Sequence, residues 1–304
     1  MSTLLSSDVQ LLQQVNASVL QGGGKMIRPM LALLAAGACG HRDDEEAVKV
    51  AAIVEVLHNA TLLHDDVVDG SHVRRGAPTV FSLLGGGPAV LLGDYWLSKA
   101  VDTILSTKVN PSALIRIFAG TISDLARGEL LQMEKAGTCD TTEQDYLSII
   151  YCKTASLFEA TAKSAAIAVG APDEYVKALA KYGSAVGSAF QIKDDIFDYS
   201  SDGSIGKPVG IDIAEKKITL PLLGALKGSP EGSSIRNLMR EMDSHPENAE
   251  KVRAFAIDGG GIAYAEKRLS DFIETALEAL SPLPETEEKS YLAELALYMA
   301  GRDK

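Results

Sequence analysis

Two short acidic motifs carry the residues with the clearest chemical potential in this chain. Both read DDxxD, at residues 65–69 and 194–198. Residues four apart share one helix face, so the first and last aspartates of each motif stack one turn apart. Paired carboxylates without cysteine or an ExxH pattern favour Mg²⁺, which usually completes its coordination with water and phosphate oxygens. The motifs therefore indicate a diphosphate held between two helices.

The presence of two DDxxD copies distinguishes a metal site from a solvent-exposed acidic helix surface. The chain has 41 acidic residues, so a single DDxxD would more often lie on an exposed helix face. Here both copies lie in apolar helical sequence, where an unpaired carboxylate is costly. Two such copies favour metal binding.

Basic residues lie near glycines in three segments. Gly22–Pro29 reads GGGKMIRP, which places two cations behind a flexible turn where a helix begins, although the spacing is not that of a P-loop. Adjacent arginines follow the first acidic motif, and GKPVGIDIAEKK follows the second. Arginine offers a fork of donors that suits phosphate. The candidate anion-binding cations are Lys25, Arg28, Arg74, Arg75, Lys207 and Lys217.

The elements that must position these residues are helices. Apolar residues recur at helical spacing almost throughout, and alternating strand-like segments are nearly absent. We expect helices near 8–20, 28–38, 44–69, 88–106, 111–135, 142–169, 173–200, 218–227, 233–243, 247–257, 260–280 and 286–300. No linker or compositional shift divides the chain, so we predict an all-α protein with one domain over residues 1–304.

Composition excludes several classes of function. The 304 residues carry a formal charge of −12, which argues against long-range attraction to nucleic acid or anionic lipid. The longest apolar stretch, Met30–Cys39, is far too short to cross a bilayer, and the N-terminus lacks an export signal. We therefore expect a cytoplasmic protein without stable membrane insertion. Cys39, Cys139 and Cys152 lack CxxC spacing and are expected to be free thiols, with Cys152 buried in a helix.

Taken together, these segments resemble the trans-isoprenyl diphosphate synthases, or polyprenyl synthetases. The resemblance covers nearly the whole chain through GGGKMIRP, LLHDDVVDGSHVRRGAPT, GDYWLSKA, ARGELLQ, YCKTASLF, FQIKDDIFD and GKPVGIDIAEKKITLPLL. It implies an all-α helical bundle of the isoprenoid synthase type with a central cavity, the two acidic motifs facing each other across its mouth, and a homodimer.

The resemblance also implies roles for individual residues. About three Mg²⁺ ions would hold the allylic diphosphate, bound by Asp65, Asp66, Asp69, Asp194, Asp195 and Asp198. Arg74, Lys153, Lys207 and Lys217 would clamp that diphosphate, and Lys25, Arg28, His58 and Arg75 would bind isopentenyl diphosphate. Thr154 and Gln191 would line the reacting centre, and Glu129 and Gln132 of RGELLQ match more loosely.

The implied reaction needs no side-chain nucleophile. Metal ions and cations stabilise negative charge as the allylic C–O bond breaks, leaving a carbocation in a water-poor cavity. The alkene of isopentenyl diphosphate attacks it, and a proton is lost to the departing diphosphate. The expected product is an all-trans polyprenyl diphosphate.

Product length depends on the residues one turn before Asp65, which line the path of the growing chain. Ala60 and Thr61 are small, whereas short-chain members of the family carry bulky aromatic residues there. The first motif also lacks the two-residue insertion of bacterial short-chain enzymes. We therefore expect a product longer than C20, unless Phe118, Tyr151 or Phe158 closes the tunnel deeper down. Geranylgeranyl or farnesyl diphosphate is the alternative product.

Three other functions remain as alternatives. A class I terpene cyclase usually has an Asn/Ser/Glu pattern in place of the second DDxxD. A catalytically silent subunit of a heteromeric prenyltransferase typically loses motif aspartates, whereas this chain keeps all six. A metal-storage bundle needs glutamate and ExxH ligands, which the sequence lacks.

Overall fold

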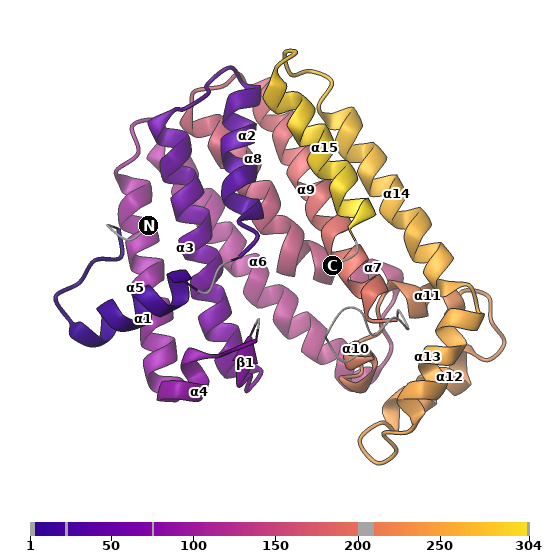
Figure 1. Ribbon diagram of the computed structural model, residues 1–304. Coiled ribbons are helices and arrows are strands. Elements are labelled where there is room, and N and C mark those ends of the chain that lie inside the picture. The colour runs from indigo at the N-terminus through magenta and orange to yellow at the C-terminus, as the bar shows by residue number, and fades with distance from the viewer. Residues whose placement is uncertain (1–3, 22–23, 75, 200–209, 303–304) are drawn as a thin grey trace. The chain divides into compact units, whose positions relative to one another are not determined.

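The structure is a computed structural model that describes residues 4–21, 24–74, 76–199 and 210–302. Figure 1 shows that helices make up nearly all of this part of the chain. They are α1 (Gln10–Gln21), α2 (Ile27–Ala38), α3 (Glu45–Val68), α4 (Val80–Leu84), α5 (Gly86–Leu105), α6 (Pro111–Thr138), α7 (Glu143–Ile150), α8 (Ser156–Ala168), α9 (Asp173–Phe197), α10 (Ile211–Ala214), α11 (Leu220–Leu226), α12 (Gly232–Arg240), α13 (Asn248–Asp258), α14 (Gly261–Ala279) and α15 (Glu287–Gly301). The predicted all-α class is confirmed.

The helix boundaries follow the predicted ranges closely, with three differences. The range predicted as one helix over 142–169 contains a π-helical turn, η1 (Tyr151–Ala155), between α7 and α8. The short helices α4 and α10 were not predicted, because four or five residues are too few to show a periodic pattern. A two-residue antiparallel ladder pairs β1 (Val73–Arg74) with β2 (Ala77–Pro78) after the first acidic motif.

The chain groups into two compact units, each described by itself. The first comprises residues 1–118, 161–176 and 284–289, and the second comprises residues 119–160, 177–283 and 290–304. The prediction of a single domain over the whole chain stays a prediction.

In the first unit, α3 packs against α2 and α5. Val50, Ile53 and Val54 of α3 are completely buried, as is Trp96 of α5. By length and composition α3 is apolar enough to cross a membrane, but 56% of its apolar window is buried inside the protein. The high hydropathy of α3 is therefore explained by its position as the core helix of this unit.

In the second unit, α11 packs against α13 and α14, and α9 supplies completely buried residues that include Leu179, Tyr182 and Ile192. The Tyr182 hydroxyl donates to the Leu292 carbonyl at 2.6 Å, which joins α9 to α15. Buried hydrogen bonds of this kind hold the elements that carry the second acidic motif.

Candidate functional site

The first acidic motif lies at the C-terminal end of α3 in the first unit. The Asp69 N–H donates to the Asp65 carbonyl at 2.8 Å, so the backbone keeps helical spacing between them although Asp69 follows the last helical residue. The backbone therefore places Asp65 and Asp69 one turn apart, and the stacking of their carboxylates stays a prediction. Asp66 is buried, and its carboxylate accepts from Arg74 Nε at 2.7 Å.

Arg74 lies in β1, eight residues after Asp66, and forms an ion pair with that carboxylate. Thr79 holds the β1–β2 hairpin: its N–H donates to the His72 carbonyl at 3.1 Å and its hydroxyl to the Ser71 carbonyl at 2.7 Å. The predicted diphosphate clamp Arg74 thus lies beside the motif it was expected to serve. Arg75 lies outside the described residues.

The other predicted cations of the first unit lie around α2. Lys25 is exposed just before α2, and Arg28 is half-buried in its first turn. A helix start combined with two cations suits an anion, because the first N–H groups lack helical partners. His58 is half-buried on α3, which packs directly against α2.

The predicted product-length residues lie on α3 as well. Ala60 is completely buried, and Thr61 is half-buried with its hydroxyl donating to the His58 carbonyl at 2.8 Å. Neither side chain is large, and the Thr61 hydroxyl is satisfied by its own helix. Both side chains on this part of α3 are therefore small, and their effect on product length stays a prediction.

The second acidic motif lies at the C-terminal end of α9 in the second unit. Asp194 accepts from Arg302 Nη2 at 2.7 Å, and the buried Arg302 guanidinium lies 4.0 Å from the centre of the Phe190 ring. The Asp198 carboxylate accepts the N–H groups of Ile211 at 3.1 Å and Asp212 at 3.0 Å, at the start of α10. Burial raises the pKa of Asp198.

Asp195 of the same motif has different surroundings. It is 4% exposed, and its carboxylate accepts from the Tyr146 hydroxyl at 2.7 Å and from Gln191 Nε2 at 2.8 Å. Gln191 Oε1 in turn accepts from the Thr154 hydroxyl at 2.7 Å. Burial raises the pKa values of both Asp195 and Tyr146.

The π-helical turn η1 carries Lys153 and Thr154, two of the predicted site residues. Such turns insert one extra residue into a helix and are frequent at functional sites. Lys153 forms an ion pair with Glu129 of α6, which brings the loosely matched RGELLQ segment into contact with the YCKTA segment. The turn therefore joins two sequence motifs that are remote along the chain.

Two close approaches between backbones confine η1. A Cβ on Gly128 of α6 would lie 2.7 Å from Cys152 Cβ, and one on Gly187 of α9 would lie 2.6 Å from Ala155 Cα. Both distances are shorter than any ordinary carbon contact. Glycine is therefore required at these positions to let α6 and α9 pack against the turn.

A cavity of about 200 Å³ in the second unit collects several of these residues. Its lining residues are Gln132, Lys135, Ala136, Thr141, Tyr146, Ile149, Ile150, Lys153, Gln191, Asp195, Asp212, Lys217, Ile218 and Thr219. Among the predicted residues, the structure thus brings together Lys153, Gln191, Asp195 and Lys217, with Gln132. Lys207 lies outside the described residues.

The charged or polar lining residues that the sequence did not assign to the site include Lys135, Tyr146 and Asp212. Lys217 Nζ lies 3.8 Å from Asp212 Oδ1, and burial raises the pKa of Asp212 to about 6. Asp212 belongs to the quoted GKPVGIDIAEKK segment, so a search for carboxylates near the basic residues would have found it. Tyr146 carries no such signal, because its role depends on packing.

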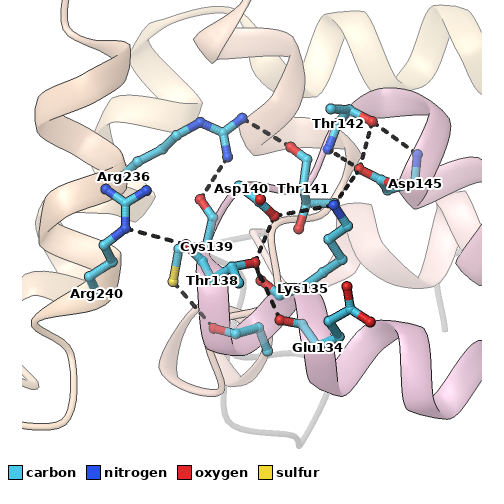
Figure 2. A network of polar contacts seen from close by, with 11 residues as sticks. Glu134, Lys135, Thr138, Cys139, Asp140, Thr141, Thr142, Asp145, Arg236 and Arg240 are labelled. Carbon is cyan, nitrogen blue, oxygen red and sulfur yellow. Dashed lines mark hydrogen bonds and ion pairs between the residues drawn. The ribbon is translucent and has the colours of Figure 1, made fainter.

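Figure 2 shows the corner where α6 ends and α7 begins. Lys135 and Thr141 of this corner line the cavity. Lys135 points between two carboxylates, at 3.2 Å from Asp140 and 3.1 Å from Asp145. Thr142 and Asp145 form a reciprocal capping box at the start of α7. Arg236 of α12 donates to the carbonyls of Cys139 at 2.8 Å and Thr141 at 3.0 Å. Contacts from α7 and from α12 thus hold the connection between α6 and α7.

The cysteines are free thiols, and Cys152 is buried in η1 as predicted. Arg127 Nη2 donates to Cys152 Sγ at 3.2 Å. This thiol therefore packs as part of the helix interface.

The polyprenyl synthetase family matches residues 9–256. The chain belongs to the polyprenyl synthetase family. The enzymatic class follows, since its named relatives are prenyltransferases. The terpene cyclase and metal-storage alternatives are thereby set aside.

Individual polyprenyl synthetases match over almost the whole chain. An all-trans-nonaprenyl-diphosphate synthase (geranyl-diphosphate specific) of Rhodobacter capsulatus is 41% identical over 96% of this chain and 89% of its own length. The octaprenyl diphosphate synthase of Escherichia coli is 38% identical over 99% of this chain and 93% of its own. The crystal structure of a decaprenyl diphosphate synthase from Rhodobacter capsulatus superposes with a TM-score of 0.92 at 36% identity, covering 100% of this chain and 94% of that one. The isoprenoid synthase fold is confirmed.

Polyprenyl synthetases are generally Mg²⁺-dependent, and the residues of both acidic motifs fit that ion. Asp65 and Asp69 offer hard oxygen ligands one turn apart, as do Asp194 and Asp198. Within the described residues, no three His, Cys, Asp or Glu side chains converge as a preformed metal cage. In proteins, Mg²⁺ usually takes part of its coordination from water and substrate phosphate oxygens.

Proposed function

We propose that this polyprenyl synthetase condenses isopentenyl diphosphate with an allylic diphosphate, head to tail, to give an all-trans product longer than C20. Two observations support the length. Ala60 and Thr61 leave the α3 surface small one turn before Asp65. Relatives that match over nearly the whole chain are named octaprenyl and nonaprenyl diphosphate synthases. Geranylgeranyl or farnesyl diphosphate as the end product remains the alternative outcome.

The carboxylates would hold the metal and the metal would hold the allylic diphosphate. The sequence motifs assign the metal to all six aspartates. We keep direct ligation for Asp65, Asp66 and Asp69 in the first motif and for Asp194 and Asp198 in the second, with about three Mg²⁺ ions in all. We infer that Asp195, whose two oxygens accept from Tyr146 and Gln191, supports the site without direct ligation. When bound, the ions supply positive charge that stabilises the departing diphosphate. Arg74 and Arg302 contact motif carboxylates at 2.7 Å, so each lies where it can exchange a carboxylate for a phosphate oxygen.

The basic residues divide between the two substrates. Arg74, Lys153, Lys207 and Lys217 would bind the allylic diphosphate, and Lys25, Arg28, His58 and Arg75 would bind isopentenyl diphosphate. Lys153 and Lys217 support the first assignment because both line the cavity of about 200 Å³. The start of α2, with a cation on either side of it, supports the second.

The cavity is the single observation that carries the chemistry. Apolar walls from Ile149, Ile150 and Ile218 adjoin polar groups from Lys153 and Gln191. Such a site can exclude water from an allylic carbocation while cations hold the diphosphate. The allylic C–O bond breaks first and leaves the carbocation. The alkene of isopentenyl diphosphate then attacks it to form the new C–C bond, and the proton released from the adduct leaves with the diphosphate.

We further propose that the enzyme is a cytoplasmic homodimer. A silent subunit of a heteromeric enzyme is the competing proposal. All six motif aspartates are present, and the described residues keep their carboxylates at two helix ends, which favours an active chain.

Purified protein would be incubated with Mg²⁺, isopentenyl diphosphate and one primer at a time: dimethylallyl, geranyl, farnesyl or geranylgeranyl diphosphate. The dephosphorylated products would be sized by chromatography and mass. We expect chains beyond C20. Products that stop at C15 or C20 would refute the length, and no product with any primer would favour the silent subunit.

A matched pair of α3 variants tests why the product is long. Ala60→Phe places a ring at the small buried position before Asp65 and should shorten the product. Val48→Phe adds the same ring on the exposed face of the same helix, where Val48 is 54% exposed, and should leave the product unchanged. Equal product lengths from the two variants would contradict the proposal that the small side chain of Ala60 permits a long product.

A further inference from the structure

Three hydrogen bonds join four side chains of the second unit into a continuous polar chain. The Tyr146 hydroxyl donates to one oxygen of Asp195, Gln191 Nε2 donates to the other, and the Thr154 hydroxyl donates to Gln191 Oε1, at 2.7, 2.8 and 2.7 Å. The chain links three elements, α7, α9 and η1. Tyr146, Gln191 and Asp195 line the cavity, and Thr154 is buried beside it.

The geometry leaves Gln191 only one orientation. An ionised carboxylate accepts hydrogen bonds and cannot donate them, so the NH₂ end of the amide faces Asp195 in its ionised form. The carbonyl end then faces Thr154, whose hydroxyl supplies the matching donor. Asp195 thus selects which end of the Gln191 amide faces each neighbour.

Tyr146 in turn holds Asp195. Each carboxylate oxygen of Asp195 receives one donor, and the residue is 4% exposed, whereas Asp194 and Asp198 of the same motif are half-buried. Without the Tyr146 hydroxyl, one buried oxygen would lose its donor, and the carboxylate would have to rotate to recover one. This rotation would break the hydrogen bond from Gln191 to Asp195 and leave the Gln191 amide free to turn.

The support behind Tyr146 is itself fixed. Tyr146 lies four residues after Thr142, the N-cap of α7. The capping box and the Arg236 contacts hold that end of the helix, and Lys135 pairs with Asp145 next to Tyr146 in sequence (Figure 2). Catalytic groups need such outer support, because small displacements at a reacting centre are costly.

We propose that Tyr146 is a positioning residue for the condensation: through Asp195 it fixes the Gln191 amide and the Thr154 hydroxyl against the reacting centre. In this role Asp195 acts as a buried hydrogen-bond acceptor, while the other motif carboxylates would bind the metal. The inference rests on the proposed function, because Gln191 and Thr154 line the reacting centre only if the cavity holds the allylic substrate.

The first test compares two variants, each of which replaces a tyrosine by phenylalanine and so removes one hydroxyl group. Tyr146→Phe removes the donor to Asp195, and Tyr182→Phe removes an equally buried donor that serves only the Leu292 carbonyl. We expect both variants to lose thermal stability. Only Tyr146→Phe should lower kcat, by about 10-fold or more, with the KM for isopentenyl diphosphate within about twofold of wild type.

A binding measurement separates positioning from metal binding. Calorimetry with Mg²⁺ and inorganic diphosphate should give affinities for Tyr146→Phe and wild type that agree within about twofold. A kcat equal to that of Tyr182→Phe would overturn the role. A large loss of diphosphate affinity would overturn it too, because Tyr146 would then act through the metal site.

Asp195 variants keep the test decisive if Tyr146→Phe does not fold. Asparagine can still accept from Gln191 and can donate to the Tyr146 oxygen, whereas alanine can do neither. We expect Asp195→Asn to exceed Asp195→Ala in kcat by about 10-fold. Equal losses would show that only the charge of Asp195 matters. An inactive wild-type enzyme would overturn the proposed function and this role together. If the wild-type enzyme is active, a failed expectation for the variants counts against the role of Tyr146 alone.

Discussion

Gly187→Ala should separate α9 from η1 and lower activity with little change in overall fold. An added Cβ would lie 2.6 Å from Ala155 Cα, and an ordinary contact begins at 3.4 Å, so the two backbones must part by about 0.8 Å. Gln191 lies one turn after Gly187, and Thr154 is adjacent to Ala155. Their 2.7 Å hydrogen bond would lengthen to about 3.5 Å, the limit at which it ceases to count.

The expected loss in kcat is about 10- to 100-fold, because a displacement near 1 Å at a reacting centre can cost about 100-fold. Overpacking should lower the free energy of unfolding by about 1–3 kcal/mol, offset by up to about 1 kcal/mol from helix propensity. Steady-state kinetics with labelled isopentenyl diphosphate and thermal unfolding measure the two effects.

Gly120→Ala is the matched control on α6. A Cβ there meets nothing within 4 Å, so the variant should keep the wild-type kcat and unfold at a slightly higher temperature. Wild-type kcat in Gly187→Ala would refute the reasoning, since it would mean that the contact between α9 and η1 does not set the position of Gln191.

Three further variants test other parts of the structure. Thr154→Val removes the donor to Gln191 Oε1 and should lower kcat about 10-fold in the same kinetic assay; an unchanged kcat would contradict the polar chain. Arg236→Ala removes hydrogen bonds to two carbonyls of the α6–α7 connection and should cost about 1–3 kcal/mol in equilibrium unfolding, whereas an unaltered transition would show that the corner is held by other contacts. Trp96→Phe removes the 2.8 Å bond from Nε1 to Asn16 Oδ1, so limited proteolysis should cleave the segment around α1 faster; equal cleavage rates would argue against this anchor.

The candidate site was predictable wherever its signal is local. DDxxD spacing on a helix places Asp65 and Asp69 one turn apart, and the structure keeps that backbone spacing at the end of α3. The YCKTA and FQIKDD motifs likewise indicated Lys153 and Gln191, which line one cavity. The roles of these residues, and the meeting of the two acidic motifs, stay proposals.

Other parts of the site carried no such signal. Arg302 contacts Asp194 although 108 residues separate them, and Tyr146 contacts Asp195 across 49 residues. Neither pair is marked by a motif, because hydrogen bonds between distant residues depend on how the helices pack. The π-helical turn was also missed, since five residues of altered winding barely disturb an apolar period of 3.6 residues.

The sequence by itself determined that the protein is built of helices, where most of them begin and end, and which acidic and basic segments carry the chemistry. These properties follow from side-chain spacing along one element, which the order of residues specifies directly. The tertiary structure alone decided that Asp195 is buried while Asp194 and Asp198 are half-buried, and that Tyr146 and Gln191 are its donors. All three aspartates have the same side chain and lie within five residues, so only the packing of α7 and η1 against α9 could distinguish them.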